Sequence, residues 1–132
     1  MEKQVCSNYP KLLSKLKADI QTKIKDSKFY AGIYIGKTND IERRTREHKE
    51  KHGYVYVTPI VYGDSLSISK LEEALIGDLK KEGVNILNKS EDSVGNNEAN
   101  ILYICFDSCH PNDELCEWDN FKIGNNYPLY CK

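Results

Sequence analysis

The chain has 132 residues, of which 39% are hydrophobic and 30% charged, and this composition predicts one folded domain rather than a disordered segment. The length leaves little room for a large cofactor fold beside a second domain. No apolar run approaches membrane-spanning length. The N-terminal lysines are not followed by the apolar stretch of a signal peptide, so an intracellular location is expected.

The net charge of −1 argues against a nucleic-acid-binding protein, but the charges are unevenly distributed. Residues 1–53 carry 13 Lys/Arg and 7 Asp/Glu, a net charge of +6, and residues 54–132 carry 6 and 13, a net charge of −7. A basic half can attract a polyanion, and an acidic half can hold a metal ion. Ordinary scatter of surface charge explains the same asymmetry.

Three elements are predicted in the first half of the chain. Residues 11–25 have apolar side chains at helical spacing, and Pro10 suits the first turn of that helix. Residues 28–36 alternate, so that tyrosines and glycines share one face of a half-buried strand. Residues 40–52 form a second helix between capping residues at 38–40 and a stop at Gly53.

In the second half, residues 54–62 predict a strand in which Pro59 marks an edge or a bulge. An apolar stripe from Ile68 to Leu79 predicts a third helix, opened by a capping box of Ser69 and Glu72. Short extended residues 84–87, a polar loop at 90–100 and a strand at 101–106 follow, and the chain is irregular from residue 107.

These elements predict an α/β fold, more narrowly α+β, with a small, mostly antiparallel sheet of about three strands flanked by helices. Residues 1–132 are expected to form a single domain. Its core is expected at about 28–106, and residues 107–132 form a cysteine-containing tail.

The helix at 40–52 has an unusually polar face. Ile41, Arg44 and His48 share this face, and only the isoleucine is apolar. Arg44 and His48 are i, i+4 neighbours that can converge on one anion, because the arginine fork matches phosphate oxygens and the imidazole can move a proton near neutral pH. A solvated charged surface is the alternative for both residues, and it is the preferred interpretation for Arg43 and Arg46.

Tyr34 stands on the non-core face of the strand at 28–36 and is followed by Gly36 and Lys37. The glycine can let a substrate backbone approach closely. A tyrosine hydroxyl beside cations can orient or deprotonate a water molecule. The alternative is a packed tyrosine without a chemical role.

Glu72 falls within the apolar arc of the third helix, whereas Glu73 points away from it. A half-buried carboxylate needs a partner, and a magnesium ion is a suitable one. The capping box with Ser69 offers a structural role instead, and the sequence leaves both roles open.

Together these residues resemble the GIY-YIG nuclease family over about residues 28–90. The shared features are the Tyr34-Ile35-Gly36 strand, the Lys37-Thr38 turn, an arginine ten residues after the tyrosine, a histidine four residues later, a glutamate four residues before an isoleucine, and an asparagine between Leu87 and Lys89. The resemblance implies catalytic roles for Tyr34, Lys37, Arg44 and His48. It also implies that Glu72 binds Mg²⁺ (or Mn²⁺) and that Gly36, Thr38 and Asn88 bind substrate.

One feature departs from the family. Members carry a Gly-Ile-Tyr strand before the Tyr-Ile-Gly strand, whereas here residues 32–36 fuse the two motifs and share Tyr34. The first tyrosine of the family is therefore unaccounted for. We hypothesise that the strand at 101–106 pairs with this sheet, and that Tyr103, or Tyr30 on the Tyr34 face, replaces it.

The expected function is therefore a divalent-metal-dependent endonuclease that hydrolyses phosphodiester bonds in DNA, with branched or nicked DNA among the candidate substrates. The alternative is a catalytically inactive GIY-YIG-like module that binds nucleic acid or a protein partner. No membrane partner is expected, and the sequence does not predict an oligomeric state.

The chain has five cysteines, an odd number that argues against a complete disulfide framework. Cys105, Cys109, His110 and Cys116 provide zinc-ligand types, but no Cys-x-x-Cys pair occurs among them. Cys105 also lies in an apolar run, where a buried thiol is expected. Structural thiols are the preferred interpretation, and zinc or a disulfide is the alternative.

Overall fold

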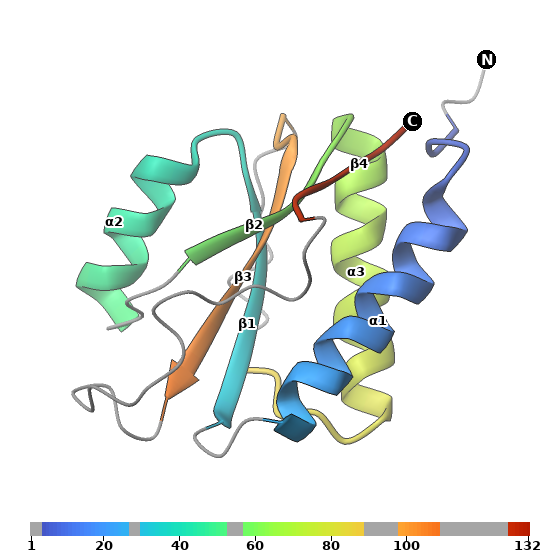
Figure 1. Ribbon diagram of the computed structural model, residues 1–132. Coiled ribbons are helices and arrows are strands. Elements are labelled where there is room, and N and C mark those ends of the chain that lie inside the picture. The colour runs from blue at the N-terminus through green and yellow to red at the C-terminus, as the bar shows by residue number, and fades with distance from the viewer. Residues whose placement is uncertain (1–3, 27–29, 53–56, 89–97, 109–126) are drawn as a thin grey trace.

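The computed structural model describes residues 4–26, 30–52, 57–88, 98–108 and 127–132 (Figure 1). These residues form α1 (Tyr9–Asp26), β1 (Tyr30–Thr38), α2 (Ile41–His52), β2 (Val57–Tyr62), α3 (Ser65–Lys81), β3 (Ile101–Ser108) and β4 (Leu129–Tyr130). The fold is α+β, as the sequence predicts. The observed helices and strands lie within a few residues of their predicted ranges, apart from β4, which the sequence does not predict.

The sheet has the order β1-β3-β2-β4 and contains four strands in the described residues, rather than about three. β3 lies antiparallel between β1 and β2, which confirms the hypothesis that the strand after residue 100 pairs with the tyrosine strand. β4 runs parallel to β2 through Leu129 and Tyr130, so the sheet is mixed. A strand of two residues is too short to show alternation, which explains why the sequence does not predict it.

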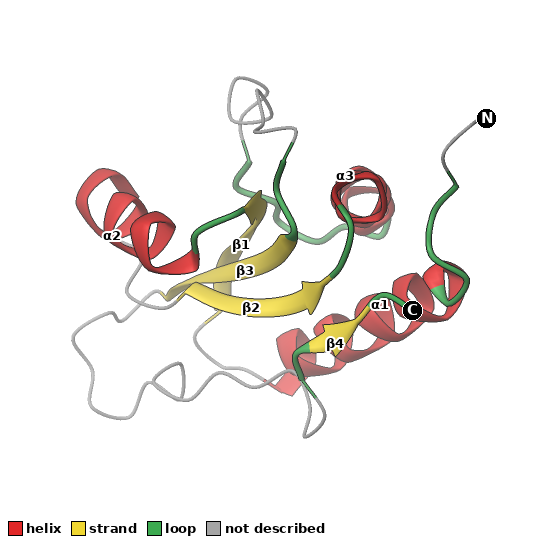
Figure 2. Cartoon of the chain, turned by 90° about the horizontal axis from the view of Figure 1, so that it is seen from above, coloured by secondary structure: helices red, strands yellow, loops and turns green. Residues whose placement is uncertain are grey.

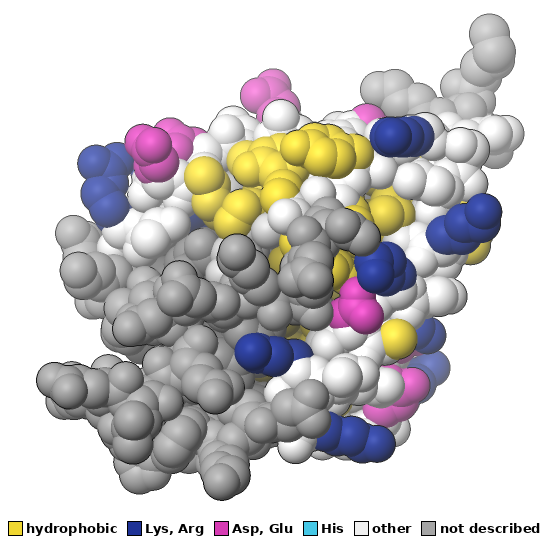
Figure 3. Space-filling view, in the orientation of Figure 1, with side chains coloured by type: hydrophobic (Ala, Val, Ile, Leu, Met, Phe, Trp, Pro, Cys, Tyr) yellow, Lys and Arg dark blue, Asp and Glu magenta, His cyan; other side chains and the backbone are white. Residues whose placement is uncertain are grey.

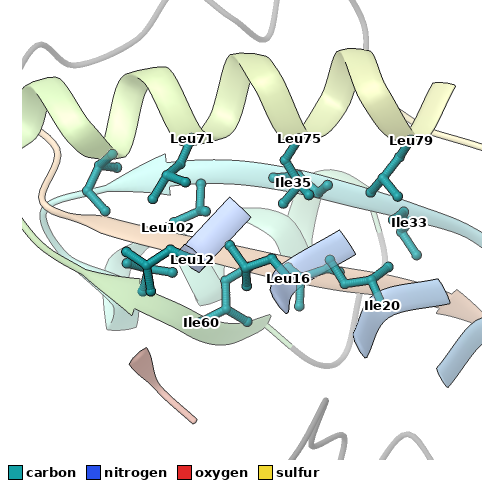
Figure 4. Packing of buried hydrophobic residues seen from close by; sticks show 13 residues of the cluster. Leu12, Leu16, Ile20, Ile33, Ile35, Ile60, Leu71, Leu75, Leu79 and Leu102 are labelled. Atoms are coloured by element: carbon teal, nitrogen blue, oxygen red, sulfur yellow. The ribbon is translucent and has the colours of Figure 1, made fainter. Parts of the chain in front are cut away.

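The helices are divided between the two faces of the sheet, with α1 and α3 on one face and α2 on the other (Figures 1 and 2). The main core lies on the α1 and α3 side (Figure 4). There, leucines and isoleucines of both helices pack against alternate residues of the strands. The fully buried members are Leu16, Ile20, Ile33, Ile35, Ile60, Val61, Ile68, Leu71, Leu75, Leu79, Leu102 and Ile104. Alternation in β1 therefore leaves Tyr34 on the α2 side.

Two aspartates cap the beginnings of α2 and α3. Asp40 caps α2, because its Oδ1 accepts a hydrogen bond of 3.0 Å from the backbone N–H of Arg43. Asp64 caps α3 by accepting from the backbone N–H of Ser67 at 2.8 Å. The predicted capping box of Ser69 and Glu72 is therefore wrong, because α3 begins about one turn earlier and both residues lie inside the helix.

The predicted irregularity at Pro59 is a bulge, since the β2–β3 register shifts between Pro59 and Val61. The predicted extended run at 84–87 lies along the outer edge of β1. The N–H of Ile33 donates to the carbonyl of Asn85, and the N–H of Leu87 donates to the carbonyl of Ile33. This segment therefore fixes the edge of the strand that carries Tyr34.

Among the described residues, the basic groups of the first half of the chain are divided between the two faces of the sheet. The lysines of α1 lie on one side of the sheet, and the arginines of α2 lie on the opposite side (Figures 1 and 2). The space-filling view shows the Lys and Arg side chains around α1 interspersed with acidic ones (Figure 3). In the described part of the chain, no helix combines the length and the apolar character needed to cross a membrane.

Candidate functional site

Two tyrosines stand side by side on the α2 face of the sheet. Tyr34 of β1 and Tyr103 of β3 have ring centroids 6.3 Å apart and an interplanar angle of 20°. Both side chains are buried, and they form a second small cluster with Cys105, against which Ile41 of α2 packs. The antiparallel register places these rings together, because Tyr103 lies directly opposite Gly36.

The structure explains why position 36 is a glycine. A Cβ atom at this position would collide with the hydroxyl and ring of Tyr103, so only glycine lets the phenol lie across β1. The sequence suggested that the glycine makes room for a substrate backbone. In the structure, the side chain of Tyr103 occupies that space.

Arg44 of α2 reaches both tyrosine hydroxyls. Its Nε donates to the hydroxyl of Tyr103 at 2.8 Å, and its Nη2 donates to the hydroxyl of Tyr34 at 3.3 Å. Its Nη1 donates to Oε2 of Glu47 at 2.7 Å, one turn along the helix. The planar guanidinium is thus held by three different side chains, which fixes its position over the tyrosine pair.

The electrostatics of this cluster keep the arginine charged and the phenol neutral. Burial opposes the charge of Arg44, but hydrogen bonds with Tyr103 and Glu47 outweigh burial and raise its pKa. Burial raises the pKa of Tyr103 well above its usual value, although Arg44 acts in the opposite direction. Near neutral pH the Tyr103 hydroxyl is therefore protonated and does not act as a preformed base.

Glu72 lies half-buried on α3, and the described residues offer its carboxylate neither a hydrogen bond nor a close ion pair. Burial raises its pKa, while the positive charges of Lys37 and Arg44 lower it. Nζ of Lys37 donates to Oγ of Ser69 at 2.9 Å, on the same helix. Because the capping box does not form, a structural explanation for Glu72 is lost. A half-buried carboxylate to which no described residue donates is a suitable ligand for a hard divalent cation.

Two residues that are expected to bind substrate make contacts that support the local fold. The hydroxyl of Thr38 is buried and accepts from the backbone N–H of Asp40 at 3.1 Å, in the turn before α2. The amide of Asn88 bonds both backbone groups of Ile35: Oδ1 accepts from its N–H at 3.0 Å, and Nδ2 donates to its carbonyl at 2.6 Å. These contacts hold β1 and the beginning of α2 in place beside Arg44.

Some predicted site residues lie outside the described part of the chain. His48 belongs to α2 and Tyr30 to β1, but the side chains of both residues are outside the description. Of the suggested zinc ligands, Cys109, His110 and Cys116 are also outside it, and Cys105 is buried beside the tyrosine pair. In the ranges that are described, no three His, Cys, Asp or Glu side chains gather as a metal site.

Sequence reasoning overlooked two residues of this site. Glu47 accepts from Arg44 and also lies 3.3 Å from Nε of Arg43. Its i, i+3 and i, i+4 spacing from the two arginines was the available signal. Ser69 accepts from Lys37, and no local pattern predicts this contact because β1 and α3 are joined only by tertiary packing.

The site thus brings together a fixed cation and two phenols from β1, β3 and α2, and the charges of Lys37 and Arg44 act on the half-buried carboxylate of Glu72 on α3. A guanidinium can bind a phosphate oxygen, a neutral phenol can orient water, and a carboxylate can hold a divalent cation. Comparison of the chain with protein-family models, with curated proteins and with solved structures finds no match.

Proposed function

We propose that the protein is a divalent-metal-dependent endonuclease that hydrolyses phosphodiester bonds in DNA, with a GIY-YIG-like site. The observation that supports this most strongly is the contact of one arginine with two tyrosine hydroxyls on adjacent antiparallel strands. Members of the family carry their two signature tyrosines on such a strand pair. In this proposal Tyr34 is the second tyrosine, and Tyr103 takes the place of the first.

This proposal implies a change in the order of the chain. In the family the strand with the first tyrosine precedes the Tyr-Ile-Gly strand, whereas β3 follows β1 by more than 60 residues. Antiparallel pairing of β3 with β1 still gives a tyrosine-bearing neighbour strand. In this proposal the two tyrosines come together through a different connection, which would account for the lack of a separate first motif in the sequence.

In the proposed reaction, Arg44 binds a non-bridging oxygen of the scissile phosphate through its outer nitrogens and stabilises the negative charge that develops there. The hydroxyls of Tyr34 and Tyr103 orient the attacking water toward phosphorus, because both are held at the same guanidinium. His48 follows Arg44 by one helical turn and is a candidate to accept the proton from that water.

Glu72 is the residue that would hold a magnesium or manganese ion, because it offers a half-buried carboxylate whose pKa responds to the charges of Lys37 and Arg44. Glu72 would hold the ion, which would supply charge stabilisation at the leaving oxygen. Lys37 assists by its positive charge, which favours the ionised carboxylate of Glu72. The hydrogen bond from Lys37 to Ser69 holds the lysine side chain against α3.

One observation favours a second candidate function, DNA binding without cleavage. Nε, Nη1 and Nη2 of Arg44 each have a protein partner already. If Glu47 does not release Nη1, Arg44 acts mainly as a support for the fold. Phosphate contacts would then come from exposed arginines of α2 such as Arg43 and Arg46.

A plasmid-nicking assay with Mg²⁺ or Mn²⁺ tests the proposal. Wild type is expected to nick the plasmid. The nicking rates of Arg44→Ala and Glu72→Gln are expected to be lower by at least about 100-fold. The matched controls are Arg43→Ala, which removes the neighbouring exposed arginine, and Glu73→Gln, which removes the neighbouring exposed carboxylate. Both controls are expected to keep the wild-type rate.

Binding measured on the same preparations separates the two candidates. If wild type binds a DNA duplex but does not nick it under any of these metal conditions, the binding module is the correct function. Nicking that survives both Arg44→Ala and Glu72→Gln would show that this site does not carry the activity.

A further inference from the structure

A second cluster lies on the main-core side of the sheet, where the C-terminal segment 127–132 meets the beginnings of α1 and α3. The backbone N–H of Ser7 donates to the carbonyl of Lys132 at 3.0 Å. The side chain of Asn8 donates to the carbonyl of Tyr130 at 3.0 Å and accepts from the N–H of Lys132 at 2.9 Å. These bonds fix the register between two segments that are more than 120 residues apart.

A cysteine from each segment enters this cluster. The N–H of Cys6 donates to Oγ of Ser67 at 2.8 Å, at the first turn of α3. The N–H of Cys131 donates to the carbonyl of Tyr62 at 2.9 Å, at the end of β2. Both backbones are thus anchored independently on the same corner of the fold, and both side chains are half-buried against the main core.

The two cysteines are neighbours at this corner. Ser7 and Lys132, the residues next to them in the chain, are hydrogen-bonded at 3.0 Å, and the Cys131 thiol interacts with Cys6 and Ser67. Gly63 makes room for it, because a Cβ there would overlap Cβ and Sγ of Cys131 at 2.6 Å. The hydrogen bond between Ser7 and Lys132 holds the backbones of the two cysteines close together, which is the first requirement for a disulfide.

We propose that Cys6 and Cys131 form an intramolecular disulfide that fastens the C-terminal segment to the beginnings of α1 and α3. In the structure both are free thiols, so the described state is the reduced form. The bond would close a loop of about 125 residues, which removes much of the conformational freedom of the unfolded chain.

Glutathione disulfide is a sufficient oxidant. The thiolate of Cys6 attacks one sulfur of glutathione disulfide, which forms a mixed disulfide and releases one glutathione thiolate. The sulfur of Cys131 then loses its proton and attacks the Cys6 sulfur, which releases the second glutathione. Two protein thiols are oxidised, and one glutathione disulfide is reduced to two glutathione molecules.

The Cys131 thiol suits the second step better than the first. Burial, followed by the neighbouring Cys6 and Asp64, raises its pKa to about 12, so the thiolate is rare near neutral pH. Attack on an external disulfide is therefore unfavourable for Cys131. Attack on a mixed disulfide already in contact with it needs no encounter in solution.

The chain allows an unambiguous mapping experiment. Cleavage after lysine places Cys6 in peptide 4–11 and Cys131 in peptide 123–132, while the other three cysteines all lie in peptide 90–122. The full chain is equilibrated in glutathione buffers of increasing oxidised fraction, alkylated, digested and analysed by mass spectrometry without reduction. Cys109→Ser/Cys116→Ser serves as a background without the two cysteines outside the described residues.

The expected result is a cross-link between peptides 4–11 and 123–132, with the thiol count falling from five to three in wild type and from three to one in the background variant. Oxidation should raise the thermal midpoint by about 10 °C, and reducing agent should reverse this. Cys6→Ser and Cys131→Ser should each abolish the shift. The proposal is overturned if, in the folded background variant, both thiols stay free in fully oxidised glutathione, or if either one links to peptide 90–122.

This disulfide does not depend on the proposed nuclease function. The pair lies by the first turn of α3, and none of its contacts involves Arg44, Tyr34 or Tyr103. Nicking by the oxidised and reduced proteins at a temperature where both are folded is expected to be equal.

Discussion

The hydroxyl of Tyr103 accepts a hydrogen bond of 2.8 Å from Nε of Arg44, although the two residues are 59 positions apart. This contact joins β3 to α2 across the face of β1, and it brings a second phenol to the arginine that Tyr34 already contacts. The proposed site depends on this bond more than on any local motif.

Tyr103→Phe removes this bond and leaves Nε of a half-buried guanidinium without its acceptor. We expect a loss of about 1–3 kcal/mol in the free energy of unfolding, because the bond involves a charged group. We also expect a loss of about 100-fold or more in the nicking rate, because the water-orienting hydroxyl is gone. Urea denaturation and single-turnover nicking measure the two effects.

Tyr34→Phe is the matched comparison, because its hydroxyl lies farther from Arg44, at 3.3 Å. It should cost less stability than Tyr103→Phe while still slowing cleavage. If Tyr103→Phe nicks at the wild-type rate, Tyr103 does not replace the first tyrosine of the family.

Gly36→Ala tests the same site from the opposite strand. The added methyl group overlaps the phenol of Tyr103, so the ring must move away from Arg44. We expect a destabilisation of about 1–3 kcal/mol from overpacking, accompanied by loss of nicking. Thermal unfolding and the nicking assay provide the measurements.

Gly77→Ala is the control for glycine replacement in general. Gly77 lies within α3, and an added Cβ there meets nothing within 4 Å. This change should stabilise the protein by about 0.5–1 kcal/mol, because alanine favours the helix.

The double variant Gly36→Ala/Tyr103→Ala tests whether the clash causes the loss. The clash is absent in it, so its destabilisation should be smaller than the sum of the destabilisations of the two single variants. Additive losses would mean that the Tyr103 ring does not limit residue 36.

Local patterns were sufficient to predict much of this arrangement. Alternation placed Tyr34 on the non-core face, and helical spacing placed Arg44 on the same face of α2 as Ile41, which packs against the tyrosine pair. The partner of Tyr34 needed non-local information, because the register that sets Tyr103 against Gly36 is fixed by strand pairing between distant segments. The sequence could suggest β3 and its tyrosine but could not specify the hydrogen bond.

The beginning of α3 shows a different limit of sequence reasoning. Ser69 and Glu72 match a capping box, but Asp64 and Ser67 provide an earlier cap that matches the start of the helix. Both patterns are plausible locally. Because β2 ends at Tyr62 and α3 begins at Ser65, the helix starts at the earlier cap. The apolar stripe was predicted correctly, because Leu71, Leu75 and Leu79 pack on the core with either helix start.

Asn88 offers a test that separates support of the fold from substrate contact. Asn88→Ala leaves the buried N–H and carbonyl of Ile35 without their partners, so we expect a loss of about 1–3 kcal/mol in stability. Asn88→Asp should be similarly destabilising, because a carboxylate cannot donate to that carbonyl. Nicking per folded molecule should be nearly unchanged at low temperature. A raised KM with unchanged stability would instead indicate substrate binding.

Glu72→Gln is expected to make stability less dependent on pH. Burial raises the pKa of Glu72 above its ordinary value of 4.5, so the folded protein retains this proton at pH values where the unfolded chain has lost it. Wild-type stability from this group is therefore fully present below about pH 4.5 and is lost as pH rises through the folded pKa. The glutamine variant should match wild type at pH 4 and exceed it at pH 7, as measured by urea denaturation. Glu73→Gln, at an exposed position, should show no such difference.

The same variants test whether Glu72 holds a divalent cation, by a measurement that does not need nuclease activity. If the carboxylate binds Mg²⁺ only in the folded protein, millimolar Mg²⁺ should raise the thermal midpoint of wild type at pH 7. The shift should vanish in Glu72→Gln and persist in Glu73→Gln, because only Glu72 is shielded from solvent beside Lys37 and Arg44. It should also weaken as pH falls, because protonation of Glu72 removes the charge that attracts the ion. An equal Mg²⁺ shift in Glu72→Gln and wild type would place any bound cation elsewhere and remove the basis for assigning Glu72 as its ligand.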